Sequence, residues 1–189
     1  MPFELLETTL DGPLLLQPKV FGDGRGFFVE TYRRSDFMAV GIREEMVQDN
    51  HSRSTRGVVR GIHFSVGRGV GKLVRCARGH IYDVLVDLRR GSPTYGGWEA
   101  YDLTDQDMRI LYAPPGFGHG FCVVSDVADV VYMQDAYYDP ATEREISIRD
   151  PAIGITWPVP DGELQLSQRD LDAPLLATIA DELPFRYGT

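Results

Sequence analysis

The stretch HIYDVLVDL, residues 80–88, decides the fold class predicted for this chain. In an extended strand Val84 and Val86 share one face, whereas Asp83 and Asp87 share the other face. This alternation, with a period of two residues, predicts a β-strand rather than a helix.

Similar short β-rich runs lie on both sides of this strand, and 20 glycines and 12 prolines punctuate the chain between them. Ser125 and Asp126, which separate two of the runs, predict a hairpin turn. Many short strands with regular turns are typical of a β-sandwich or barrel. The runs span residues 27–32, 58–64, 73–77, 110–112, 120–124 and 129–134.

Helix signals are few and lie mainly near the C-terminus. Ser35 could cap a short turn that runs to Val40 and ends at Gly41. Ser167 and Pro174 precede LLATIADEL, residues 175–183, which predicts a short C-terminal helix. We therefore predict an all-β jelly-roll sandwich or barrel with a few short helices.

Size and composition indicate one globular domain over residues 1–189, with 43% hydrophobic and 25% charged residues. The formal net charge of −9 argues against general binding to nucleic acid or to a membrane. We expect no signal peptide and no membrane span, because no apolar run approaches the roughly 20 residues that crossing a bilayer requires. Cys76 and Cys122 lack metal or redox spacing, so we expect reduced thiols in a cytoplasmic protein.

Basic residues are concentrated in the middle of the chain. Between His51 and Arg90 nine Lys/Arg and two Asp/Glu give a balance of +7, and the other 10 basic and 26 acidic residues give −16. A basic segment in an acidic chain favours a compact anion such as a phosphate or pyrophosphate. The alternative is charge scattered over the surface.

The stretch QDNHSRSTRGVVRGIHF, residues 48–64, carries polar side chains where a buried strand would have valines. Within it His63, a potential general base, lies three residues from the cation Arg60, which suggests proton transfer on an anionic substrate. In strict alternation these two side chains would point to opposite faces. Both can address one ligand only if the strand is irregular near Gly61 or if Arg60 reaches round an edge. The alternative is a structural histidine.

Three other residues are candidates for the same site, each with a structural alternative. His119 lies in the loop PPGFGHGF, residues 114–121, and loops often carry ligand contacts. Lys72 follows GRGVG and could stabilise an enolate oxygen, or it could be an ordinary strand-end lysine. Tyr132 could donate a proton, although tyrosines in strands are usually packing residues. Because neither His63 nor His119 has His-x-His spacing, we expect no metal.

Several blocks, in this order along the chain, resemble the dTDP-4-dehydrorhamnose 3,5-epimerase family. The similarity runs from Val20 to Leu176, and several collinear blocks are far more specific than a single motif. The blocks are residues 48–64 and 114–121 quoted above, FGDGRGFFVETY (21–32), GKLVRCARGHIYDVLVDLRRGSPTYGGW (71–98), VVYMQDAYYDP (130–140), DPAIGITWP (150–158) and SQRDLDAPLL (167–176).

The resemblance implies a cupin-like jelly roll that acts on dTDP-4-keto-6-deoxyglucose without a metal or redox cofactor. The implied reaction is epimerisation at C3 and C5, which gives dTDP-4-dehydro-L-rhamnose. His63 would be the base and Asp170 its carboxylate partner, and a carboxylate there would fix the imidazole tautomer. Lys72 would steady the enolate oxygen, and Tyr132 would return a proton to the opposite face of the sugar.

The resemblance also implies substrate contacts and a homodimer with shared active sites. Arginine and amide donors suit a pyrophosphate, a carboxylate suits the N–H of thymine, and Tyr138 would stack on the base. The implied substrate-binding residues are Arg25, Glu30, Gln48, Asn50, Arg60, His119, Tyr138, Glu143 and Arg169.

The chain departs from the family pattern around the base and in the following loop. These departures leave the product stereochemistry open, because related enzymes of antibiotic-sugar pathways invert only C3 or only C5. The departures are Ile62-His63-Phe64-Ser65 in place of Leu-His-Tyr-Gln, SVGRGVG (65–71) without the usual prolines, and Met133, Glu145 and Arg169 in place of Lys, Gly and Lys.

Three other functions remain as alternatives. A related 3,4-ketoisomerase would commonly have a second histidine beside the base, and Gly61 and Ser65 argue against it. A non-catalytic sugar-nucleotide-binding cupin would keep the ligand contacts without the chemistry. A metal-dependent cupin would need a clustered ligand set.

Overall fold

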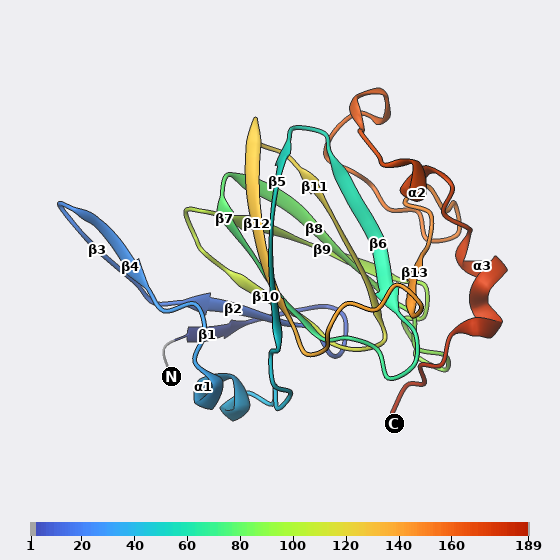
Figure 1. Ribbon diagram of the computed structural model, residues 1–189, viewed down its shortest axis with the longest axis horizontal. Helices are drawn as coiled ribbons and strands as arrows, with labels where there is room; N and C mark the ends of the chain where they lie inside the picture. Colours follow the sequence, from blue (N-terminus) through green and yellow to red (C-terminus); the bar gives the residue numbers. More distant parts are fainter. Residues whose placement is uncertain (1–2, 189) are drawn as a thin grey trace.

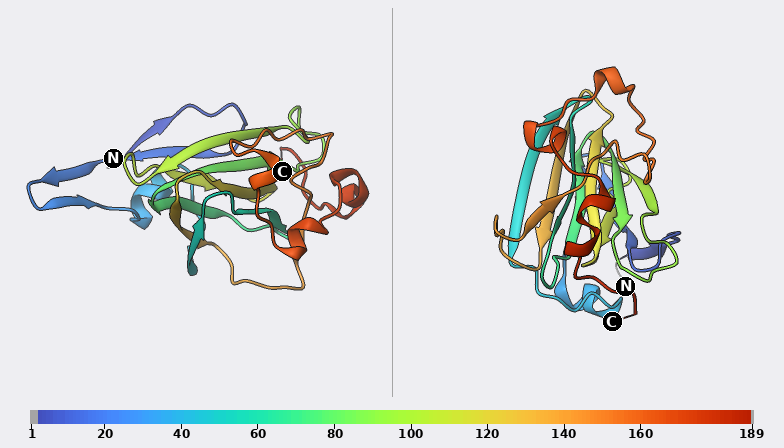
Figure 2. Two further views of the ribbon diagram at one scale, coloured as in Figure 1. Left: turned by 90° about the horizontal axis from the view of Figure 1, so that it is seen from above. Right: turned by 90° about the vertical axis from the view of Figure 1, so that its right-hand side faces the viewer.

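Two antiparallel β-sheets lie face to face in the computed structural model, which describes residues 3–188 (Figures 1 and 2). The first has six strands in the order β1 (Phe3–Leu6), β2 (Leu14–Pro18), β10 (Ile110–Ala113), β7 (Lys72–Arg78), β12 (Val127–Gln134) and β5 (Gln48–Thr55). The second has five, in the order β13 (Glu143–Glu145), β6 (Val59–Ser65), β11 (Phe117–Val123), β8 (His80–Asp87) and β9 (Trp98–Thr104). The predicted all-β sandwich is confirmed.

A separate hairpin of β3 (Val20–Asp23) and β4 (Gly26–Val29) projects away from the two sheets (Figure 1). Its large side chains face solvent: Phe27 and Phe28 are 62% and 68% exposed. The strand predicted at residues 27–32 corresponds to β4, which is shorter and begins one residue earlier.

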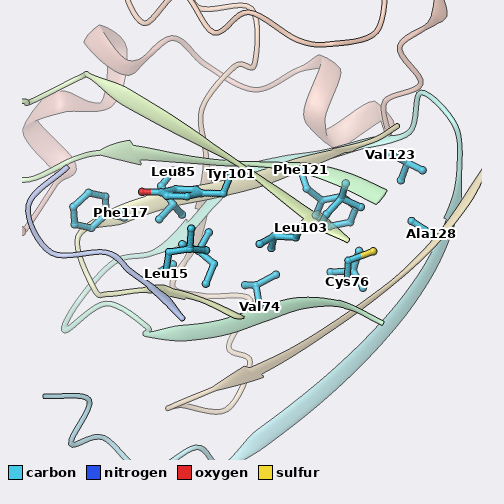
Figure 3. Close-up of a cluster of buried hydrophobic side chains, with 14 of the residues drawn as sticks. Leu15, Val74, Cys76, Leu85, Tyr101, Leu103, Phe117, Phe121, Val123 and Ala128 are labelled. Carbon is cyan, nitrogen blue, oxygen red and sulfur yellow. The ribbon is translucent and has the colours of Figure 1, made fainter. Parts of the chain in front are cut away.

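The main core fills the space between the sheets. Leu85 and Phe121 of the five-stranded sheet pack there with Val74 and Cys76 of the six-stranded sheet (Figure 3). These residues come from β8, β11 and β7. Because side chains alternate between the two faces of a strand, every second residue of these strands points into the space between the sheets.

A second core lies on the outer face of the five-stranded sheet, where the C-terminal part of the chain covers it (Figure 2). Val84 and Val86 pack there against Ile146 and Leu176. Strand β8 is therefore buried on both faces, and Asp83 and Asp87, its two aspartates, have no exposed surface. A buried carboxylate requires partners inside the protein.

The helices are short. Helix α1 (Arg34–Ala39) matches the predicted turn, but Ser35 does not cap it, because its N-cap is Arg33, which makes no side-chain cap bond. Helix α2 (Gln168–Leu171) begins after Ser167, whose side chain accepts a hydrogen bond from the Asp170 backbone N–H. The predicted C-terminal helix is divided into α3 (Leu176–Ile179) and the 3-10 turn η2 (Ala180–Glu182), and a further 3-10 turn is η1 (Asp161–Glu163). No helix in residues 3–188 is long and apolar enough to cross a membrane.

The hairpin predicted at Ser125-Asp126 is wrong. The strands before and after this turn, β11 and β12, belong to different sheets, so the chain crosses from one layer to the other there. The Ser125 hydroxyl holds this corner, because it accepts a hydrogen bond from the His80 backbone N–H and donates one to the Val127 carbonyl. A turn signal marks a change of direction but does not specify which strand pairs with which.

The two cysteines are free thiols buried in the strands, and we predict that neither reacts in the native protein. Burial raises the pKa of the Cys76 thiol to about 12 and that of Cys122 to about 11. Since the thiolate is the reactive form, Ellman's reagent at pH 8 should modify neither thiol until denaturant is added, and then both. Rapid modification of one thiol without denaturant would contradict this prediction.

Candidate active site

A cavity of about 700 Å³ opens between the two sheets and the C-terminal segment. Eleven of the thirteen residues expected at the site line it, and only Arg25 and Glu30 lie elsewhere. The lining residues are Gln48, Asn50, Ser52, Val58, Val59, Arg60, His63, Lys72, His119, Phe121, Tyr132, Gln134, Tyr138, Glu143, Gln165, Leu166, Ser167, Arg169 and Asp170.

A histidine–aspartate pair lies at one wall of the cavity. His63 Nε2 is 2.6 Å from Asp170 Oδ1, although the two residues are 107 positions apart in the chain. Burial alone would raise the pKa of Asp170, but hydrogen bonds from His63 and Ser167 outweigh it and lower that pKa below its usual value. An ionised carboxylate only accepts hydrogen bonds, so Nε2 carries the proton and Nδ1 keeps a lone pair. The pair can therefore act as a general base.

The strand that carries His63 departs from strict alternation, as the shared site of Arg60 and His63 requires. Gly61 has φ of +138°, and the pairing of β6 with β11 shifts register between His119 and Phe121. A side chain at Gly61 would place its Cβ 2.4 Å from the Cα of Gly120 on β11. The glycine thus permits both the irregular backbone and the close approach of the strands. As a result Arg60 and His63 both line the cavity.

Lys72 and Tyr132 face the base from the opposite sheet. Lys72 begins β7, and Tyr132 lies on the adjacent strand β12. Burial lowers the pKa of Lys72, although attraction to Glu143 and Asp83 acts against it. Burial also raises the pKa of Tyr132, and the negative charge of Glu143 raises it further. A neutral phenol can donate a proton, and an ammonium can stabilise a developing oxyanion.

A second histidine–aspartate pair, which the sequence analysis missed, lies beside the first. His119 was predicted in a loop but lies within strand β11. It pairs in register with His63 across β11 and β6, and its Nε2 is 3.0 Å from Asp83 Oδ2 on β8. Burial raises the pKa of Asp83, while His119 and Lys72 act in the opposite direction. The aspartates in the alternating pattern of residues 80–88 were the available signal, because an aspartate within a doubly buried strand needs a polar partner.

Amide side chains form a hydrogen-bonded group on the six-stranded sheet, next to the lysine and the phenol. Gln134 Oε1 accepts a hydrogen bond from Asn50 Nδ2 at 2.9 Å, and Gln48 Oε1 accepts one from the Tyr138 backbone N–H at 2.8 Å. Gln134 was not among the predicted site residues, although it follows Tyr132 by two positions and so shares its face. The amide side chains therefore place hydrogen-bond donors and acceptors along one wall of the cavity.

Acidic side chains lie at the side of the cavity next to the base. Ser65 donates a hydrogen bond to Glu143, and Arg169 Nε donates one to Glu145 at 2.9 Å. Glu145 pairs in register with His63 across β13 and β6. Two of the departures from the family pattern, Glu145 and Arg169, thus compensate each other's charge.

The two predicted site residues outside the cavity belong to the projecting hairpin and its neighbouring segment. Arg25 forms an ion pair with Asp23, and its side chain is 91% exposed. Glu30 forms an ion pair with Arg33. Their contacts within this chain are local.

The basic middle of the chain contributes less to the cavity than its charge suggested. Of its nine Lys/Arg, Arg60 and Lys72 line the cavity. Others are paired elsewhere: Arg53 binds Asp129, for example. The expectation of a basic anion site therefore holds for two residues, and others pair with carboxylates elsewhere, such as Arg89, whose side chain is 14% exposed, with Asp87.

Residues 3–188 contain no group of three or more His, Cys, Asp or Glu side chains arranged to hold a metal ion. The two histidines in the cavity each contact one aspartate, Asp170 and Asp83 respectively. The expectation that the protein works without a metal stays a prediction, which elemental analysis of the purified protein would test.

Residues 7–178 match the family model described as dTDP-4-dehydrorhamnose 3,5-epimerase. The chain belongs to this family. It is 45% identical to the dTDP-4-dehydrorhamnose 3,5-epimerase of Salmonella typhimurium over 174 residues, which cover 91% of this chain and 94% of that relative. A relative of the same description from Neisseria gonorrhoeae is 47% identical over 168 residues, and there the match spans 89% of this chain but only 51% of the relative.

Other members of the family extend the comparison. The structure of the dTDP-6-deoxy-D-glucose-3,5-epimerase of Legionella pneumophila, in complex with dTDP-4-keto-L-rhamnose, covers 99% of this chain and 100% of its own with a TM-score of 0.95 and 40% identity. A dTDP-4-dehydrorhamnose 3-epimerase of Streptomyces niveus is 46% identical over 91% of this chain and 83% of its own. The predicted family and enzyme class, an isomerase, are confirmed, and the family includes enzymes described as acting at one carbon.

Proposed function

We propose that the protein epimerises dTDP-4-dehydro-6-deoxy-D-glucose at C3 and C5 and so produces dTDP-4-dehydro-L-rhamnose. The observation that carries the proposal is the placement of His63, supported by Asp170, across one cavity from Lys72 and Tyr132. A base, a cation and a phenol are the groups that this reaction needs, and membership of the family supplies the substrate class.

The first step is removal of a proton next to the ketone. The C–H electrons move to the C4 oxygen as the proton passes to His63, which gives an enolate. Lys72 stabilises the negative charge on that oxygen, and a cation in a site shielded from water does so more strongly than in bulk solvent. C3 and C5 flank the same carbonyl, so one oxyanion position serves both carbons.

The second step returns a proton to the opposite face of the ring. The phenol of Tyr132 donates it, the enolate electrons form the new C–H bond, and the C4 ketone is restored. Burial, which raises the pKa of Tyr132, favours the neutral phenol and therefore its rapid reprotonation after each transfer. His63 lies on the five-stranded sheet and Tyr132 on the six-stranded sheet, which suits attack from opposite faces.

The decisive experiment is incubation of the keto sugar with the protein in deuterated water, followed by NMR. A 3,5-epimerase incorporates deuterium at C3 and C5 and inverts both carbons. Correctly folded protein that exchanges neither carbon would refute the proposal. Inversion at a single carbon would instead identify a C3-only or C5-only epimerase, which the similarity to the Streptomyces niveus 3-epimerase keeps as the second candidate.

Replacing Tyr132 with phenylalanine should separate exchange from inversion. Proton removal by His63 persists in this variant, so we expect deuterium to enter the sugar while inversion slows by about 10²-fold or more. NMR measures both in one sample. Tyr82→Phe is the matched control, since Tyr82 is a half-buried strand tyrosine outside the cavity. Unchanged inversion in Tyr132→Phe, or an equal loss of exchange, would contradict this role.

We further propose a homodimer in which the β3–β4 hairpin of each protomer completes the cavity of its partner. The support is that Arg25 and Glu30, which match nucleotide contacts of the family, lie on or beside a hairpin that projects with its aromatic side chains exposed (Figure 1). The nucleotide would then lie between the amide wall of one protomer and the hairpin of the other.

Mixing two inactive variants tests this arrangement. In a dimer of one His63→Asn chain and one Arg25→Ala chain, one site lacks both residues and the other retains both. Random exchange of protomers at equal concentrations should therefore restore about a quarter of the wild-type rate. Light scattering would give the oligomeric state. A mixture no more active than the separate variants would show that each chain forms its own site.

We propose that residues 1–189 act as one domain without a redox cofactor, in the cytoplasm, where nucleotide sugars are built. Fractionation of cells that produce the protein would test the location.

A further inference from the structure

The loop between the strand of the base and the strand of the lysine is bound to the residue that follows β12. We propose that Asp135 and Arg68 are positioning residues, which form a latch that fixes this loop, residues 66–71, and through it places Lys72 in the cavity. The catalytic meaning of the latch rests on the proposed function. Neither residue lines the cavity, so any effect on the reaction must pass through other residues.

The Asp135 carboxylate accepts hydrogen bonds from two residues of the loop, Arg68 and Gly71. Its side chain is only 1% exposed, and Arg68 Nη1 donates to its Oδ2 at 3.1 Å while Arg68 Nη2 donates to its backbone carbonyl at 2.8 Å. The Gly71 backbone N–H donates to Oδ1 at 3.0 Å, and the Asp135 backbone N–H donates to the Gly71 carbonyl at 3.1 Å. One residue thus binds the middle and the end of the loop.

The loop itself has little intrinsic rigidity. It contains three glycines, and glycine has more conformational freedom in a flexible segment than any other residue. At Gly69, where φ is +77°, an added Cβ would lie 2.8 Å from the Cβ of Pro115, so the close packing there excludes a side chain. A loop of this composition needs an external fastening to hold one conformation.

The fastening lies next to the catalytic groups of both sheets. Lys72 pairs in register with Gln134, so Gly71 and Asp135, which flank this pair, extend the same β7–β12 ladder. Tyr132 is on β12, three residues before Asp135, and His63 is on β6, which leads into the loop. The latch therefore joins the ends of the three strands that carry the base, the lysine and the phenol.

Lys72 is the residue most dependent on this arrangement. It is the first residue of β7 and is 8% exposed, and its ammonium is attracted electrostatically to Glu143 and Asp83. Loss of Arg68 leaves the Asp135 carboxylate without the donors that orient it, which weakens its hold on Gly71, the residue next to Lys72. The lysine would then be displaced from the oxyanion it stabilises, and a displacement of about 1 Å can cost about 10²-fold in rate.

Arg68→Ala removes the arginine contacts of the latch with little risk to folding, because the Arg68 side chain is 58% exposed, and it leaves the hydrogen bonds between Asp135 and Gly71 in place. Arg53→Ala is the matched control: Arg53 is 63% exposed and binds Asp129, an 8% exposed carboxylate on the same strand β12, at its far end. Both variants lose one arginine and uncover one aspartate. Only Arg68→Ala removes hydrogen bonds that hold the loop at residues 66–71.

We expect kcat of Arg68→Ala to fall about tenfold or more with KM within about twofold, because the lysine acts on the enolate rather than on bound substrate. Arg68→Lys, which can reach the carboxylate but not all the acceptors, should recover part of the loss. Hydrogen exchange of amides 66–72 should accelerate in Arg68→Ala. Arg53→Ala should resemble the wild type in kcat and in exchange of this loop.

Two results would overturn the inference while leaving the proposed function intact. One is an active wild type with Arg68→Ala at wild-type kcat, and the other is a loss of kcat without faster exchange of the loop. An inactive wild-type protein would refute the proposed function itself and with it the catalytic role of the latch. The wild-type measurement separates this case from the others.

Discussion

His63→Asn is expected to lower kcat by about 10²- to 10⁴-fold, the usual contribution of a positioned acid–base group. The amide still offers a donor to Asp170 but cannot take up a proton, so the variant removes the base without leaving the buried carboxylate unpartnered. NMR in deuterated water gives the exchange and inversion rates. The melting temperature should stay close to that of the wild type.

His51→Ala is the control for this prediction. His51 is 58% exposed and lies 3.6 Å from Asp129, outside the cavity, so its loss should change neither rate. Substantial proton exchange in a folded His63→Asn protein would assign the base to another residue. His119, which lies beside His63 and has its own aspartate, would be the first candidate.

Gly61→Ala is expected to have the largest effect on stability, a loss of about 3 kcal/mol in the free energy of unfolding. The new Cβ would lie 2.4 Å from the Cα of Gly120 and 3.0 Å from the His119 carbonyl oxygen. These are backbone atoms of the adjacent strand, which cannot move aside as a flexible side chain would. The φ of +138° adds strain for any residue with a Cβ. For a chain of this size we expect the melting temperature to drop by about 6–12 °C.

Gly162→Ala provides the comparison, because an added Cβ at Gly162 meets nothing within 4 Å. Calorimetry of both variants measures the difference directly. Since Gly61 lies between Arg60 and His63, any folded Gly61→Ala protein should also lose activity. A variant with wild-type stability and activity would mean that the irregularity of β6 is not needed for the site.

The strands were predictable where both the period and the boundaries were clear. Strand β8 is an example, with a pattern of alternating residues that matches its observed span from His80 to Asp87. Strand β9 was not predicted, because WEAYDLT mixes charged and aromatic residues without a simple period. The pairing of the strands was harder to predict from the sequence than their positions. The turn at Ser125 crosses between sheets, and which strands pair depends on contacts between segments far apart in the chain.

The composition of the site was predictable to a larger extent than its geometry. Family motifs located His63 and Asp170, but their 2.6 Å contact depends on helix α2 packing over the second sheet. Asp83 was missed because an aspartate in an alternating strand suggests a solvent-exposed polar face, whereas Asp83 shares its face with Leu85, and the six-stranded sheet buries this inner face of β8. Asp135 gave no signal, because its partner Arg68 lies in a loop without regular structure.

The two-layer architecture has a consequence for stereochemistry. The proposed base belongs to one sheet, and the proposed proton donor and the lysine belong to the other, so in this mechanism the width of the gap between the layers sets how far apart proton removal and proton return occur. Packed sheets lie about 10 Å apart, a gap that is held open by the side chains of the shared core. Leu85, Leu103 and Val74 would thus act as spacers for the proposed reaction, although none of the three lines the cavity (Figure 3). In the proposed mechanism the handedness of the product depends on the hydrophobic core as much as on the catalytic side chains.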